Sequence, residues 1–107
     1  MSAALGDDVS RDTTATAVRY LLQLLAEGAQ GNTVEVRVPP FGAVQAIEGP
    51  RHTRGTPPNV IETDAATWLA LATGTLSWSV ALAAGTVTAS GSRADLSEHL
   101  PILRMGE

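Results

Sequence analysis

The sequence contains no cysteine and no lysine, and its aromatic side chains make up only 4% of the residues. Without cysteine there is no disulfide framework, no thiol nucleophile and no Cys-ligated zinc site. His52 and His99 are too far apart in the chain to match the ligand spacing of a local histidine metal site. We therefore predict no metal site and expect no cofactor.

Catalytic constellations are also missing. Asp95, Ser97 and His99 are the residue types of a hydrolase triad. On a helix, however, a spacing of two residues turns each side chain about 200° from the last, so the three do not converge. We therefore expect a protein that is not an enzyme.

Positive charge is scarce, because seven arginines face eleven acidic residues and the net charge is −4. Nucleic-acid binding requires clustered cations, and the only cluster is Arg51 and Arg54 with His52 between them. No apolar run approaches the roughly 18 residues of a membrane span, and the first ten residues have no basic or apolar leader region. These features predict a cytoplasmic protein that binds no nucleic acid and contacts membranes at most peripherally.

The length of 107 residues and the 44% of hydrophobic residues indicate a single globular domain, expected over residues 11–107 after a loose N-terminal arm over residues 1–10. An apolar stripe of Val18, Leu21, Leu22 and Leu25 at i, i+3, i+4 and i+7 predicts a helix that packs on a flat surface. Alternating polarity predicts strands, and capping residues bound the shorter helices. The helices are expected over residues 12–27, 65–73, 77–84 and 93–104, and the strands over residues 33–38, 43–48, 59–63 and 86–90.

This order of elements favours one fold class. The sequence predicts about four short strands and four helices, and most of the helices come after strands. We expect an α+β domain with a single mixed or antiparallel sheet of four to five strands covered by helices.

A family resemblance becomes visible from residue 59 onward. A strand there ends in a capped helix of the form Asp-x-x-x-aromatic-Leu-x-Leu-x-x-Gly, which Asp64, Trp68, Leu69, Leu71 and Gly74 supply. The next stretch has an apolar residue, a helix containing alanine and a glycine before the last strand. With the GAVQ, GPRHTRGTPPNV and TD segments between residues 42 and 64, the chain resembles the compact actinobacterial branch of the sterol carrier protein family.

The resemblance implies a non-catalytic lipid carrier. In that family an apolar tunnel lies between the sheet and the helices and holds sterols, fatty acids, acyl-CoA or phospholipids. Trp68 and Trp78 either line such a cavity or pack in the core or at a cleft edge. The residues expected to line the cavity are Trp68, Leu71, Leu76, Trp78, Leu82 and Leu100.

The loop around Arg51, His52 and Arg54 has two interpretations. Two guanidinium groups, an imidazole and glycine-exposed amides could hold the phosphate or carboxylate of a head group. Alternatively, the arginines pair with acidic neighbours such as Glu48 or Glu62 and pin a loop that its prolines already stiffen.

Two functions remain open at this point. An empty apolar cavity of about 300 Å³ would cost about 7 kcal/mol, comparable with the whole stability of a small domain. Any cavity is therefore small, or a lipid or fatty acyl ligand or a second chain fills it. The first function is a lipid carrier, and the alternative is a ligand-free interaction or dimerisation module of the same fold. The small size and the alanine-rich helices also predict a homodimer.

Overall fold

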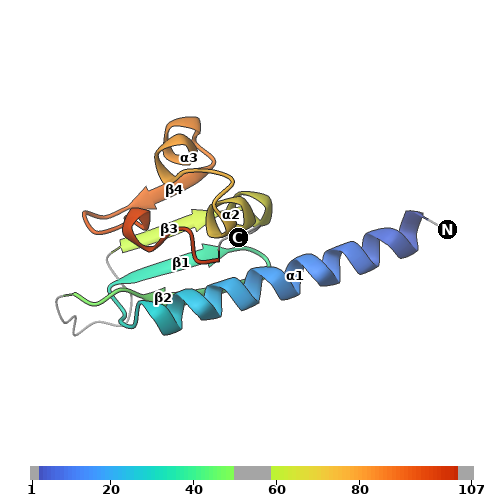
Figure 1. Cartoon of the computed structure of the whole chain (residues 1–107), viewed down its shortest axis with the longest axis horizontal. Coiled ribbons are helices and arrows are strands. Elements are labelled where there is room, and N and C mark those ends of the chain that lie inside the picture. Colours follow the sequence, from blue (N-terminus) through green and yellow to red (C-terminus); the bar gives the residue numbers. More distant parts are fainter. Residues whose placement is uncertain (1–2, 50–58, 104–107) are drawn as a thin grey trace.

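The computed structural model describes residues 3–49 and 59–103, with the backbone alone for residues 3–9. Figure 1 shows a long first helix beside a sheet, with two shorter helices and the C-terminal segment near the other strands. The described part is an α+β fold with a four-stranded mixed sheet, which confirms the predicted fold class. In chain order the elements are α1 (Ala3–Gly28), β1 (Val34–Val38), β2 (Gly42–Ala46), β3 (Asn59–Thr63), α2 (Ala65–Thr73), α3 (Trp78–Ala84), β4 (Val87–Ser90) and the 3₁₀ helix η1 (Ser97–His99).

The strands follow the order β2-β1-β3-β4. β1 is antiparallel to β2 and parallel to β3, and β3 is antiparallel to β4. In this register Val36 lies between Val44 and Ile61, on the face that packs into the core. The opposite face carries the ion pair of Glu35 and Arg37, with 2.7 Å between Oε1 and the guanidinium. The alternation that predicted β1 therefore sorts apolar from polar residues in the folded sheet.

The core lies between the sheet and the helices α1 and α2. The apolar stripe of α1 supplies Val18, Leu21, Leu22 and Leu25, all at most 4% exposed. From α2, Trp68 is fully buried, and its indole Nε1 donates to the carbonyl of Val18 at 3.3 Å, which ties α2 to α1. These side chains fill the layer in which a tunnel was expected.

The caps predicted for α2 and the glycine predicted to end α3 are confirmed. Asp64 accepts a hydrogen bond from the backbone N–H of Thr67 at 2.8 Å and begins α2, and Ser77 begins α3 in the same way. Gly74 and Gly85 end the two helices with φ of 85° and 77°, a conformation that favours glycine. Capping residues next to each helix therefore mark the bounds of both helices.

The two ends of the chain differ from expectation. α1 begins at Ala3, so residues 3–10, expected as part of a loose arm, belong to a helix whose first half extends away from the sheet in Figure 1. In place of a helix over residues 93–104, the structure has the single turn η1. The N–H groups of Ile102 and Leu103 instead donate to the carbonyl of Ala72, at 2.8 and 2.9 Å. The segment thus satisfies one of the final carbonyls of α2, which lack partners within the helix.

Asn59 joins three separate parts of the chain. Its side-chain Nδ2 donates to the carbonyl of Thr33 at 3.0 Å, and its Oδ1 accepts from the N–H of Arg93 at 2.9 Å. Asn59 is only 3% exposed. It therefore fixes the start of the C-terminal segment to the β1 and β3 ends of the sheet.

Candidate functional site

A groove of about 380 Å³ opens between α2, the start of α3 and the C-terminal segment. We call it the α2–α3 groove. The helix caps determine where the groove lies, because Gly74 ends α2 and Ser77 begins α3. Pro101 closes one side and packs against Gly74, where an added Cβ would lie 3.3 Å from the proline Cβ. Its lining is Leu71, Gly74, Leu76, Ser77, Trp78, Ser79, Ser97, Leu100 and Pro101.

The groove brings together four of the six residues predicted to line an apolar cavity. These are Leu71, Leu76, Trp78 and Leu100. Leu71 is buried and Trp78 is 8% exposed, so they form the floor, whereas Leu76 and Leu100 are half-buried at the sides. The site is thus an open groove at the surface.

The other two predicted residues lie elsewhere. Trp68 is fully buried in the core and does not line the groove, in agreement with core packing as one of its two interpretations. Leu82 is 39% exposed on α3 and also lies outside the groove lining. Sequence periodicity could not separate these residues from the four, because every one of them is an apolar residue near a helix.

Hydroxyl groups make up the polar part of the groove. Ser77 Oγ accepts a hydrogen bond from Val80 N at 3.3 Å and lies 3.5 Å from Ser79 Oγ. The N–H of Ser97 donates to Asp95 Oδ1 at 2.8 Å, and this hydrogen bond to the charged form lowers the pKa of Asp95. The lining itself therefore carries hydrogen-bonding groups but no charged side chain.

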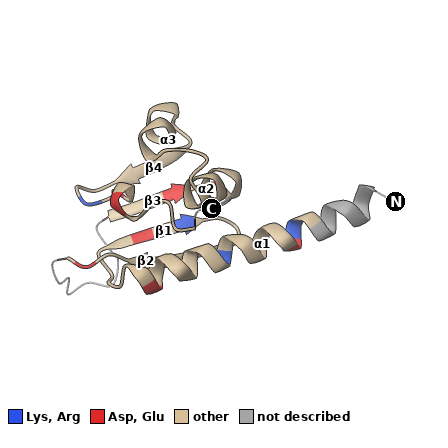
Figure 2. Cartoon of the chain, in the orientation of Figure 1, with Lys and Arg blue, Asp and Glu red and all other residues tan. Residues whose placement is uncertain are grey.

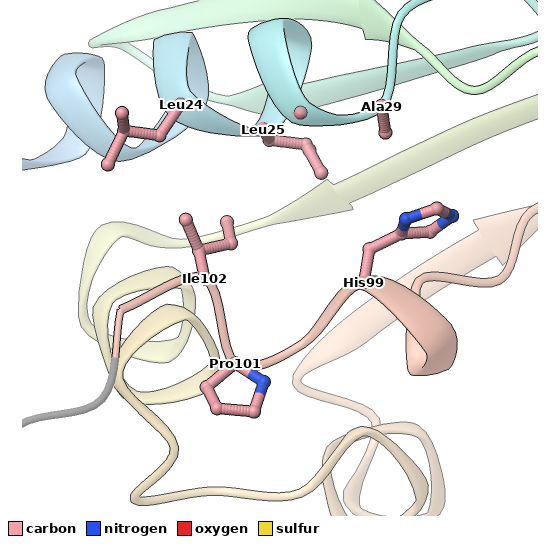
Figure 3. A pocket seen from close by; sticks show the side chains of 7 residues that line it. Leu24, Leu25, Ala29, His99, Pro101 and Ile102 are labelled. Carbon is pink, nitrogen blue, oxygen red and sulfur yellow. The ribbon is translucent and has the colours of Figure 1, made fainter.

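Two further hollows flank the C-terminal segment. One, of about 190 Å³, lies at the end of α1, where His99 points toward the helix beside Leu25, Ala29 and Ile102 (Figure 3). The other, of about 480 Å³, runs between α1 and α2 and is bordered by Leu103. Each depends on contacts between distant segments, and no local motif marked them.

The sequence also singled out the residue types of a triad, possible metal ligands and a head-group loop. Asp95 accepts a hydrogen bond from the backbone N–H of Ser97, and the charge of His99 also contributes to its lowered pKa, while His99 lines the hollow at the end of α1. Over residues 10–49 and 59–103, no three His, Asp or Glu side chains come close enough to hold a metal ion. The head-group candidates Arg51, His52 and Arg54 lie outside the described residues.

Sequence reasoning missed the polar and turn-forming part of the groove. Ser79, Ser97 and Pro101 become lining residues only because the C-terminal segment folds back onto α2. Gly74 had a visible signal as a cap, but capping does not reveal that a groove lies beside it.

Comparison with known proteins identifies a family. A family model described as a bacterial SCP ortholog matches residues 10–102, which include all of the groove lining. The match confirms the resemblance to sterol carrier proteins that the motifs predicted. No curated protein matches the chain. In the described residues no helix has the length and apolar character needed to cross a membrane.

Proposed function

We propose that this chain, which belongs to the family of bacterial SCP orthologs, is a small non-catalytic lipid carrier that binds an apolar ligand in the α2–α3 groove. The observation that carries the proposal is the convergence of Leu71, Leu76, Trp78 and Leu100 on one open groove in a member of that family. Its volume of about 380 Å³ falls in the usual range of ligand pockets.

The apolar sides of the groove provide much of the affinity. A ligand that covers Leu76 and Leu100 removes two half-exposed leucines from water, and each contributes only a part of the ~1.5–3 kcal/mol that full burial of an exposed leucine gives. The hydroxyls of Ser79 and Ser97 lie along the same groove, where they can hydrogen-bond to a polar end of the ligand. Binding of this kind needs no nucleophile or metal.

Titration with a fluorescent fatty acid tests the proposal. We expect saturable binding at micromolar concentration, with displacement by unlabelled lipids. Leu100→Gln should weaken binding at least about ten-fold, because it replaces apolar surface of the groove with an amide. Leu82→Gln is the matched control, since Leu82 lies outside the lining and should leave the affinity unchanged in this vesicle-free assay.

The outcomes separate the two functions left open by the sequence. Equal affinity of the two variants would place the ligand elsewhere. No saturable signal up to high micromolar probe would reject the carrier, and a ligand-free interaction module would replace it.

A further inference from the structure

Helix α3 is apolar on every side, although only one side is covered. Ala81 and Trp78 face inward and are 0% and 8% exposed. Val80 points away from them and is 56% exposed, and Leu82 at the flank is 39% exposed. The remaining residues of the helix, apart from Ser79, are alanines. A helix that is hydrophobic all round is normally buried or inserted in lipid, so the outer side of α3 lacks its covering partner.

The stretch of chain that contains α3 carries no ionisable side chain. Between Asp64 and Arg93 the sequence has no Asp, Glu, Lys, Arg or His. In Figure 2 the end of the molecule formed by α3 is uniformly tan, whereas the described charged residues lie on α1, on β1, after β2, on β3 and at its end, and in the segment that follows β4. Charged side chains are costly to bring into the apolar part of a membrane, and this stretch of the chain brings none.

We propose that the outer side of α3, centred on Val80, docks on a lipid surface with zwitterionic head groups. The net charge of −4 and the lack of any cation on this part of the chain argue against anionic lipids, which attract basic segments. Thr75, Ser77 and Ser79 lie around the start of the helix and supply hydroxyls at the level of the head groups. Docking through one short helix gives weak and reversible binding, which suits a surface that must also be released.

The docking surface adjoins the proposed ligand site. The first residues of α3, Trp78 and Ser79, line the α2–α3 groove. A docked α3 therefore brings the groove next to the lipids. This consequence rests on the proposed function, whereas the association with lipid does not.

Flotation with phosphatidylcholine vesicles tests the association. Val80→Glu should reduce the bound fraction at least ten-fold, because it places a carboxylate where the helix meets lipid. Tyr20→Glu is the matched control, since Tyr20 on α1 is 55% exposed and gains the same charge away from α3. The control should bind vesicles like the unchanged protein. Replacing a third of the phosphatidylcholine by phosphatidylserine should weaken binding.

Three results would overturn the proposal. They are no vesicle binding by the unchanged protein, equal losses in the two variants, and stronger binding to anionic vesicles. Sedimentation of both variants adds a further check, because dissociation of a dimer by Val80→Glu without a change in vesicle binding would assign the surface to a second copy. Both substituted residues are exposed, and circular dichroism verifies that each variant is folded.

The fatty acid titration without vesicles keeps the two proposals apart. Val80→Glu should retain its affinity for the soluble probe, since Val80 is not part of the groove lining. If the unchanged protein does not bind the probe, the carrier is refuted. If it binds the probe but not the vesicles, only the docking surface is refuted.

Discussion

Replacing Asn59 by alanine tests how the sheet and the C-terminal segment are joined. The change removes one hydrogen bond to the buried carbonyl of Thr33 and one from the N–H of Arg93. An unsatisfied buried group costs about 1–3 kcal/mol, whereas an ordinary hydrogen bond contributes about 1 kcal/mol. Thr33 is 1% exposed and Arg93 is exposed, so water replaces only the second bond. We therefore expect Asn59→Ala to lower the free energy of unfolding by about 2–4 kcal/mol.

Urea denaturation measures this change, and thermal denaturation should show a fall in Tm of about 4–8 °C per kcal/mol. Asn32→Ala is the matched control. It is the same chemical change at an exposed position, one residue before Thr33. We expect the control to stay within about 0.5 kcal/mol of the unchanged protein. A free energy of unfolding for Asn59→Ala equal to that of the control would refute the bridging role of Asn59. The bridge also holds the segment that forms one side of the α2–α3 groove, so the variant should bind the fatty acid probe more weakly.

The remaining predictions concern other parts of the chain. Trp78→Phe should abolish the change in tryptophan fluorescence on ligand binding, whereas Trp68→Phe should keep the change but lower stability, because Trp68 is in the core and Trp78 in the groove; the opposite pattern would place the ligand in the core. An NMR pH titration should give Asp95 a pKa below the ordinary value of about 3.9, because a backbone N–H donates to its carboxylate. Its contribution to stability is then fully present above the unfolded-state pKa and disappears as the pH falls through the lowered folded-state pKa, and a carboxyl that titrates normally would contradict this. The double change of Arg51 and Arg54 to alanine should weaken fatty acid binding by about 1.5–3 kcal/mol and spare a neutral ligand if these residues hold a head group, whereas equal losses for both ligands would exclude that role. Sedimentation at micromolar concentration should show a homodimer, and a single monomeric species at high concentration would disprove it.

Elements controlled by local chemistry could be predicted from the sequence. The strand over residues 59–63 and the helix over residues 65–73 have the expected bounds, and α3 begins directly after its predicted first residue, Ser77. Asp64 and Gly85 act as caps through hydrogen bonds to residues within one turn, so the sequence around each helix is enough to predict them. The alternating polarity of β1 could also be interpreted from the sequence, because it requires only that one face of the sheet packs against the core.

The C-terminal segment shows where such reasoning fails. Asp95 and Glu98 have the spacing of a capping box, which favours a helix locally. In the folded chain the N–H groups of Ile102 and Leu103 bond to the carbonyl of Ala72, roughly thirty residues away in sequence. A tertiary contact that satisfies the end of another helix outcompeted a local preference, and no local pattern contains that information.

The sequence by itself determined the fold class, most element bounds and the family, because periodicity, capping and ordered motifs are properties of neighbouring residues. It also predicted the apolar residues of the proposed site, but it did not show which of them lie together. Only the tertiary structure decided that Trp68 packs in the core while Leu100 lines a groove, since both depend on which distant surfaces meet. Only the structure, likewise, left Val80 uncovered on a helix whose sequence alone would suit complete burial.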